Sequence, residues 1–206
     1  MPEPEQPQIY LITPPEFELD VFPAQLAQVL DSADIACVRL ALSSTDEDTV
    51  IRSSDALREI AHARDIPLVI ERHIQMVERL GLDGVHLLDG TRSVRDARKT
   101  LGADAIVGAY CEASRHDGMN AAETGADYVA FGPVSQTALG GGEVAERDLF
   151  AWWSEMIEVP VVAEGALTPD IIRELGPVTD FFGVGAEIWN TDDPVAALKD
   201  LMQGLG

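Results

Sequence analysis

The stretch Leu80-Gly81-Leu82-Asp83-Gly84-Val85 ends a helix on glycine and enters an apolar strand, and Thr124-Gly125-Ala126-Asp127-Tyr128 repeats the pattern. Glycine is common just past a helix end because it adopts left-handed backbone without strain. Outward from these stretches, the chain contains eight short runs that are apolar throughout, which is typical of parallel strands covered on both faces. The runs are residues 8–13, 36–42, 67–70, 84–88, 105–108, 128–131, 160–163 and 181–184.

Amphipathic segments lie between these runs and carry helix signals. Thr168 and Asp193 each precede a proline, the order expected of an N-cap followed by proline at the first helical position. Strands that alternate with helices pair in parallel through right-handed crossovers, and eight such units close as a barrel. The predicted helices are residues 48–64, 94–101, 148–157, 169–175 and 194–202.

The sequence therefore predicts an α/β fold, a (β/α)₈ TIM barrel, as a single domain over residues 1–206. Residues 1–7 are predicted to be a disordered or extended N-terminal tail. We expect valine, isoleucine and leucine to fill the core that the strands surround.

The composition limits the partners. Hydrophobic residues make up 46% of the chain, and 36 acidic residues against 14 basic ones give a net charge of −22. Nucleic acid and anionic membrane surfaces need clustered lysine and arginine, so neither is an expected partner. The first residues, Met1-Pro2-Glu3-Pro4-Glu5, have neither the basic nor the apolar region of a signal peptide, so none is expected, and no apolar run comes near the roughly 20 residues that span a bilayer. Cys37 and Cys111 fall on separated strands, and two reduced thiols fit a cytoplasmic protein.

Chemically capable side chains are expected where strands end. In a (β/α)₈ barrel the functional groups come from the carboxyl ends of the strands and the loops that follow them. That rule selects Arg39, Glu71, Arg72, His86, Asp89, Cys111, Glu112, Thr137, Glu164, Gly165 and the stretch Gly185-Ala186-Glu187.

The last two strands are the most informative. Ala163-Glu164-Gly165-Ala166-Leu167-Thr168-Pro169 runs from a strand through a glycine turn into a helix, and Phe182-Gly183-Val184-Gly185-Ala186-Glu187-Ile188 does something similar. Small residues allow an anion to approach the backbone closely, and loops seven and eight form the usual phosphate site of such barrels. The alternative interpretation is plain packing of small residues. The predicted phosphate-binding residues are Gly165, Ala166, Val184, Gly185 and Ala186.

Several charged residues allow two interpretations each. Arg39 either binds a ligand anion or neutralises Glu71 or Glu112. Glu71, Asp89 and Glu112 form either a carboxylate cluster for a metal or, with Arg72 beside them, a solvated ion-pair network. A buried Glu164 needs a partner or a raised pKa, because an unpaired buried carboxylate is costly.

At these residues the sequence resembles the thiamine phosphate synthase family, which includes the thiazole tautomerases. The best matches are Gly84-Val85-His86-Leu87 and the stretch from Ala126 to Val134, with Thr137 just after. Val38-Arg39-Leu40 and Pro160-Val161-Val162-Ala163-Glu164-Gly165 match two further elements. The resemblance covers nearly the whole chain.

The resemblance implies a reaction that joins a pyrimidine pyrophosphate to a thiazole phosphate with help from Mg²⁺. The chain departs from it at the metal and pyrophosphate positions. Ala41 and Gly140 stand where the family has lysines, and Arg72 and Thr91 stand where it has metal-binding aspartates. No metal ligand is therefore assigned. The residues that persist include Arg39, His86 and Thr137, which are the candidate catalytic residues; for His86 a role as a hydrogen-bonded core histidine is the alternative.

Three functions stay open at this point. The first is thiamine phosphate synthesis, a transferase reaction, in which a phosphorylated thiazole or thiamine phosphate is the small ligand. The second is a non-catalytic family member that binds such a ligand as a carrier, sensor or regulator. The third is another phosphate-substrate barrel enzyme such as a sugar-phosphate epimerase. Trp152-Trp153 indicates either helix packing or a homodimer surface.

Overall fold

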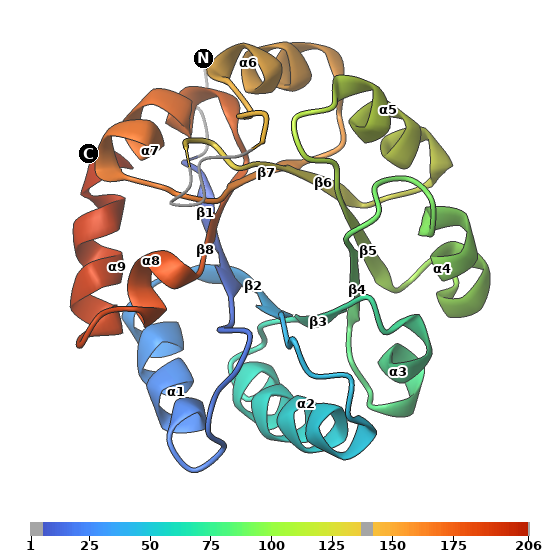
Figure 1. Cartoon of the computed structure of the whole chain (residues 1–206), viewed down its shortest axis with the longest axis vertical. Coiled ribbons are helices and arrows are strands. Elements are labelled where there is room, and N and C mark those ends of the chain that lie inside the picture. The colour runs from blue at the N-terminus through green and yellow to red at the C-terminus, as the bar shows by residue number, and fades with distance from the viewer. Residues whose placement is uncertain (1–5, 137–141, 206) are drawn as a thin grey trace.

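The structure, a computed structural model, describes residues 6–136 and 142–205. Its strands form a closed barrel in sequence order, each parallel to both neighbours, and β8 returns to pair with β1 (Figure 1). The α/β barrel predicted from the sequence is thereby confirmed. The strands are β1 (Gln8–Ile12), β2 (Ile35–Leu40), β3 (Leu68–Glu71), β4 (Gly84–Leu87), β5 (Ile106–Tyr110), β6 (Tyr128–Phe131), β7 (Val161–Glu164) and β8 (Phe181–Val184).

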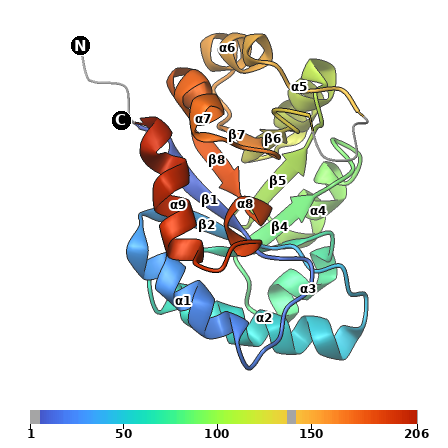
Figure 2. The same ribbon diagram turned by 60° about the vertical axis from the view of Figure 1, so that its left-hand side comes forward.

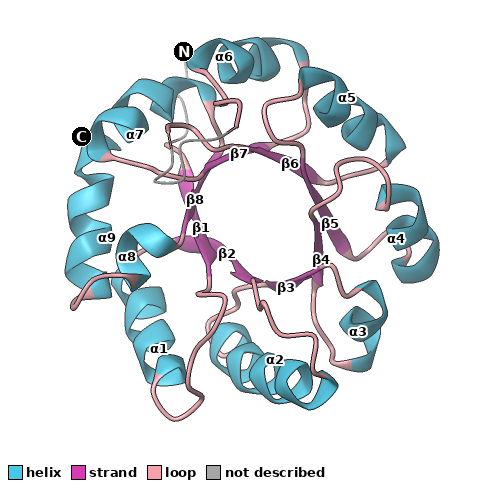
Figure 3. Ribbon diagram, viewed as in Figure 1, coloured by secondary structure: helices cyan, strands magenta, loops and turns pink. Residues whose placement is uncertain are grey.

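Helices surround the ring of strands (Figure 3). The short helix α8 lies between the end of β8 and helix α9, against which it packs (Figure 2). No described helix is both long enough and apolar enough to cross a membrane. The α-helices are α1 (Phe22–Ser32), α2 (Glu47–His62), α3 (Ile74–Arg79), α4 (Val94–Leu101), α5 (Arg115–Thr124), α6 (Arg147–Met156), α7 (Pro169–Leu175), α8 (Ala186–Trp189) and α9 (Pro194–Met202), with 3₁₀ turns η1 (Gly176–Val178) and η2 (Gln203–Leu205).

The element boundaries follow the local signals closely. Helices α4, α7 and α9 have the predicted bounds, and the Thr168 and Asp193 side chains accept amide hydrogens at the starts of α7 and α9, as N-caps do. Strands β2 and β5 differ most from their predictions. Strand β2 begins one residue earlier and ends two residues earlier. Strand β5 begins one residue later and runs two residues further, because Tyr110 still pairs with Ala130 of β6.

Aspartates just before β4, β6 and β8 have a structural role, and the first two, Asp83 and Asp127, belong to the repeated helix–glycine–strand stretches. The carboxylate of Asp83, just before β4, accepts the Leu68 amide hydrogen at the start of β3 (2.7 Å). Asp127 does the same for Val107 in β5 (2.7 Å), and Asp180 does so for β7. Each aspartate therefore connects the loop that leads into its own strand with the first residues of the preceding strand, at the amino-terminal end of the barrel.

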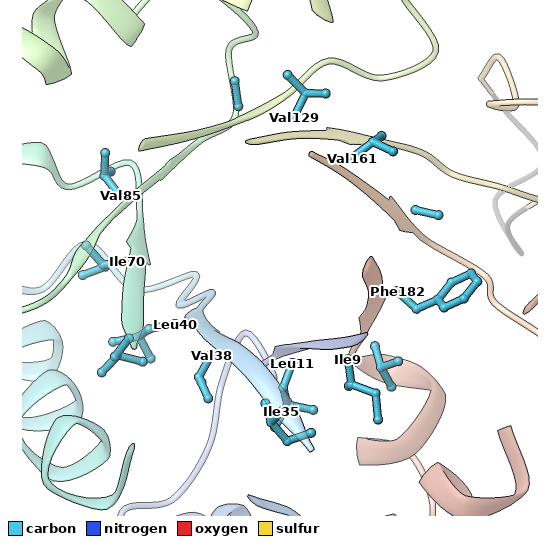
Figure 4. Packing of buried hydrophobic residues seen from close by; sticks show 14 of the residues in the cluster. Ile9, Leu11, Ile35, Val38, Leu40, Ile70, Val85, Val129, Val161 and Phe182 are labelled. Carbon is cyan, nitrogen blue, oxygen red and sulfur yellow. The ribbon is translucent and has the colours of Figure 1, made fainter. Parts of the chain in front are cut away.

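The outer layer of the core lies between strands and helices. Figure 4 shows side chains such as Ile9, Val38 and Ile70 pointing away from the ring of strands. They pack against apolar residues of the helices, for example Leu26 and Leu57, which are fully buried. Valine, isoleucine and leucine dominate this outer layer.

The space inside the ring of strands differs from the prediction. Branched aliphatic side chains are only part of its filling, which also includes tyrosine, small and charged side chains. Gly108 explains part of this, because a Cβ there would lie 2.0 Å from the Tyr128 ring, so the glycine leaves room for the tyrosine. Two inner groups result: an apolar and aromatic layer of Tyr10, Cys37, Val69, Tyr128, Ala130 and Val162, and the buried polar residues Arg39, Glu71 and His86.

Candidate active site at the barrel mouth

Arg39 is the central charge of the barrel interior. It lies in β2, is only 5% exposed, and points into the ring because its neighbours Val38 and Leu40 pack outward. Its Nη1 and Nη2 donate to the two carboxylate oxygens of Glu164 at 2.9 and 3.2 Å, and its Nε lies 3.1 Å from Glu71 Oε1. Arg39 therefore neutralises Glu71, which was one of its two predicted acidic partners. Its second partner is Glu164 and not Glu112.

Two carboxylates facing one guanidinium leave an excess of negative charge. Burial opposes the charge of Arg39, but Glu164, Tyr10 and Glu71 more than offset this and raise the pKa of its guanidinium. Burial raises the pKa of Glu71, with Arg39 opposing the rise and Glu164 adding to it. The partner required by Glu164 is thus Arg39.

A hydrogen-bond chain continues from Arg39 down the barrel. Arg39 Nη1 lies 2.8 Å from His86 Nε2, and His86 Nδ1 lies 2.8 Å from the Tyr128 hydroxyl, which in turn contacts the Tyr10 hydroxyl. Arginine only donates, so Nε2 of His86 accepts and Nδ1 carries the proton. Burial, then Arg39, lowers the pKa of His86 well below its usual value. His86 is a neutral, fully buried histidine beneath Arg39.

A pocket of about 550 Å³ opens above this network at the carboxyl ends of the strands. Its floor is formed by Arg39, Glu71 and Glu164. Among the described residues that line it, Arg39 is the one lysine or arginine. The pocket also includes the predicted phosphate-binding residues Gly165, Ala166, Gly185 and Ala186, but not Val184, whose side chain is buried in the outer core.

The loops after β7 and β8 form one wall of this pocket. Gly165 and Ala166 have positive φ values of 86° and 59°, a backbone that turns sharply away from the strand. The carboxylate of Glu187 bridges the two loops, since Oε1 accepts the Leu167 amide hydrogen (3.1 Å) and Oε2 accepts that of Gly185 (2.9 Å).

The remaining acidic candidates are divided between two places. Asp89 and Glu112 line a second pocket of about 460 Å³ between the ends of β4 and β5, whereas Glu71 lies in the first pocket. Arg72, with φ of 66°, donates to the Leu42 carbonyl (3.0 Å) and lies 3.9 Å from Glu71. Within residues 6–136 and 142–205, no three histidine, cysteine or acidic side chains are grouped to hold a metal ion.

The other predicted residues are placed as follows. Thr137 lies outside the described residues. Cys37 and Cys111 are free buried thiols, and burial raises the pKa of each to about 12. Trp153 is buried in helix packing, whereas the Trp152 ring lies beneath the Arg115 guanidinium at 4.2 Å.

Sequence reasoning missed the roles of Tyr10 and Tyr128 and the bridging role of Glu187. The signal for the tyrosines was available, because both alternate with outward-facing apolar neighbours and must therefore face inward. The contacts of Glu187 depend on a loop 20 residues earlier, and no local pattern predicts them.

A closed barrel of eight parallel strands with a polar pocket at their carboxyl ends places the chain in the class of (β/α)₈ proteins that carry their sites in the βα loops. The chain belongs to the thiamine monophosphate synthase family, whose model matches residues 9–178.

Known relatives agree along almost the entire chain. The chain is 39% identical to a thiamine-phosphate synthase of Rhodospirillum centenum over 198 residues, covering 94% of this chain and 95% of the relative. It is 37% identical to a thiamine-phosphate synthase of Erythrobacter litoralis, with 95% of each covered. The solved thiamine phosphate pyrophosphorylase of Pyrococcus furiosus has a TM-score of 0.82 at 20% identity, over 96% of this chain and 95% of that one, and shares the fold.

Proposed function

We propose that this protein binds a phosphorylated thiazole or thiamine phosphate at the barrel mouth, and that the magnesium and pyrophosphate half of the family's site is degenerate. One observation carries the proposal. Arg39, the one lysine or arginine lining the pocket within residues 6–136 and 142–205, is engaged by both Glu71 and Glu164. A pyrophosphate would therefore meet a floor with excess negative charge.

The phosphate end is supported by the wall formed after β7 and β8. Gly165, Ala166, Gly185 and Ala186 present backbone and at most a methyl group to the pocket. Backbone amides of loops seven and eight are the usual phosphate ligands in barrels of this kind. A phosphate group there would point the rest of the ligand toward Arg39 and Glu164.

The residues present do not fit a magnesium site. Mg²⁺ prefers carboxylate and water oxygens in octahedral geometry. Arg72 and Thr91 stand at the positions where the resemblance implies metal-binding aspartates, and Glu71 is held by Arg39. Asp89 and Glu112 line the separate pocket between β4 and β5.

The expected consequence is a binding protein with little or no synthase activity. Departure of pyrophosphate needs its developing charge to be neutralised, and the loss of one positioned electrostatic group costs roughly 10²–10³ in rate. Ala41 replaces a lysine of the family at the pocket wall, in addition to the two changed metal positions. Several such losses leave turnover many orders of magnitude lower, even though their effects are not additive.

The test is product formation from both substrates, followed with Mg²⁺ and with a chelator. We expect no more than trace thiamine phosphate, while calorimetry detects binding of thiazole phosphate. Robust turnover that depends on Mg²⁺ would refute the degenerate site. Absence of binding for both thiazole phosphate and thiamine phosphate would refute the ligand.

A further inference from the structure

The Glu187 carboxylate, which lines the mouth pocket, accepts two backbone amide hydrogens, and one of them belongs to the pocket-lining Gly185. Oε1 accepts the Leu167 amide hydrogen from the loop after β7, at 3.1 Å, and Oε2 accepts the Gly185 amide hydrogen from the loop after β8, at 2.9 Å. Glu187 is half-buried and lines the pocket beside Gly185 and Ala186. One anionic group thus joins two loops that are adjacent only in the folded barrel.

A ligand phosphate at this wall would compete with that carboxylate. An amide N–H has a single hydrogen, so the oxygen that Glu187 places on Gly185 excludes a phosphate oxygen from the same donor. Glu187 also adds a negative charge next to an incoming dianion, in a pocket whose floor already holds Glu71 and Glu164. Like charges a few ångströms apart in a partly buried site repel strongly.

We propose that Glu187 is a specificity-determining residue that acts as an internal competitor of the ligand phosphate. The inference rests on the phosphate wall proposed above, and it concerns how tightly that wall binds an anion. Phosphate enters only when the Glu187 side chain leaves the Leu167 and Gly185 amides. The residue therefore weakens binding of phosphorylated ligands relative to their dephosphorylated forms.

A purely structural role makes the opposite forecast. If Glu187 only connects the two loops, its removal makes the pocket wall less ordered and weakens the binding of every ligand. If Glu187 competes, its removal selectively tightens the binding of phosphorylated ligands and leaves the affinity for dephosphorylated ligands nearly unchanged. The ratio of the two affinities therefore separates the roles.

The experiment measures binding to the full chain and to Glu187→Gln and Glu187→Ala, with Glu174→Gln as control. Glu174 is an exposed glutamate in α7, so its replacement removes the same charge away from the pocket. The probes are sulfate, thiazole phosphate and the corresponding thiazole alcohol. Calorimetry gives the affinities, and amide chemical shifts of Leu167 and Gly185 report where sulfate binds.

We expect sulfate and thiazole phosphate to bind at least about tenfold more tightly to Glu187→Ala than to the parent, with a smaller gain in Glu187→Gln. The affinity for the thiazole alcohol should change less than about twofold in both Glu187 variants, and the affinities of Glu174→Gln for all three probes should change as little. Unchanged or weaker sulfate binding in both Glu187 variants overturns the inference, and so do sulfate-insensitive Leu167 and Gly185 amides. A sulfate gain without any thiazole phosphate binding supports the competitor role while refuting thiazole phosphate as the ligand.

Discussion

Arg39 and Glu164 lie 125 residues apart in the chain and are joined by two parallel hydrogen bonds, of 2.9 and 3.2 Å, at the floor of the barrel mouth. Bidentate arginine–carboxylate pairs are among the strongest hydrogen bonds in proteins. Glu71 approaches the same guanidinium at Nε, and the three side chains are 6%, 10% and 12% exposed for Arg39, Glu71 and Glu164. The group holds one positive charge against two carboxylates, and this imbalance makes the members unequal in their effect on stability.

Arg39→Met should destabilise the fold far more than Glu164→Gln. The first change leaves Glu164 without a cation and Glu71 with only Arg72 at 3.9 Å, and should lower the free energy of unfolding by about 3–5 kcal/mol. The second leaves a one-to-one pair of Arg39 and Glu71 and should cost about 1–2 kcal/mol. Urea unfolding of both variants, with Glu174→Gln as control, measures the difference. Equal losses would mean that the two carboxylates do not share the guanidinium.

Acidification should destabilise the protein in part through His86. The native pKa of His86 lies well below 6.5, because the residue is buried and beside Arg39. The unfolded chain takes up a proton near pH 6.5 that the native state does not, so the free energy of unfolding falls as the pH drops below 6.5. His86 can change the free energy of unfolding by at most about 1.4 kcal/mol per pH unit.

The measurement compares parent and His86→Gln by urea unfolding between pH 5 and 7.5. The parent should lose more stability on acidification than the variant. Glu71 has the opposite effect on the pH dependence of stability, because its native pKa is raised. The stability that Glu71 contributes is present at low pH and is lost as the pH rises through that raised pKa. Glu71 is present in both proteins, so the comparison isolates His86. Parallel pH profiles would show that the pKa of His86 is not lowered in the native state.

Gly108→Ala should strain the barrel interior at Tyr128. The added Cβ would lie 2.0 Å from the Tyr128 ring, closer than any packing allows, so the variant should lose about 1–3 kcal/mol or more. Combining it with Tyr128→Leu should recover part of that loss, because the smaller side chain vacates the space. Thermal unfolding of the two single variants and the double variant forms a cycle. Additive losses would place the strain elsewhere.

The barrel itself was predictable because its signals are local. Apolar runs, glycines at helix ends such as Gly125, and the N-caps Thr168 and Asp193 each fix one element, and eight strand–helix units leave one closed arrangement. The Arg39–Glu164 pair was not predictable in detail. It depends on how β2 and β7 face each other across the barrel interior, and the sequence offered Glu71 and Glu112 as the partners of Arg39.

The filling of the barrel interior was mispredicted for a similar reason. Apolar runs show that strands are buried on both faces, but they do not tell how large the side chains on the inward face must be to fill the barrel. Gly108 and Tyr128 compensate for each other on adjacent strands, and only the register of β5 against β6, in which they pair, reveals it. The roles of loop residues such as Glu187 depend on contacts between loops, which periodicity does not encode.

The last prediction concerns Arg72 as a substitute for the metal. Its side chain is 48% exposed and donates to the Leu42 carbonyl beside Ala41, so a guanidinium lies near the rim of the mouth pocket. Arginine binds phosphoryl oxygens well through paired N–H donors. If any pyrophosphate binds here, it should bind without Mg²⁺, with an affinity unchanged by a chelator and reduced about tenfold in Arg72→Ala. Calorimetry with inorganic pyrophosphate measures this, and Arg95→Ala, which removes an exposed arginine of α4, is the matched control. Binding that requires Mg²⁺ and survives Arg72→Ala would instead assign the pyrophosphate to a carboxylate-bound metal.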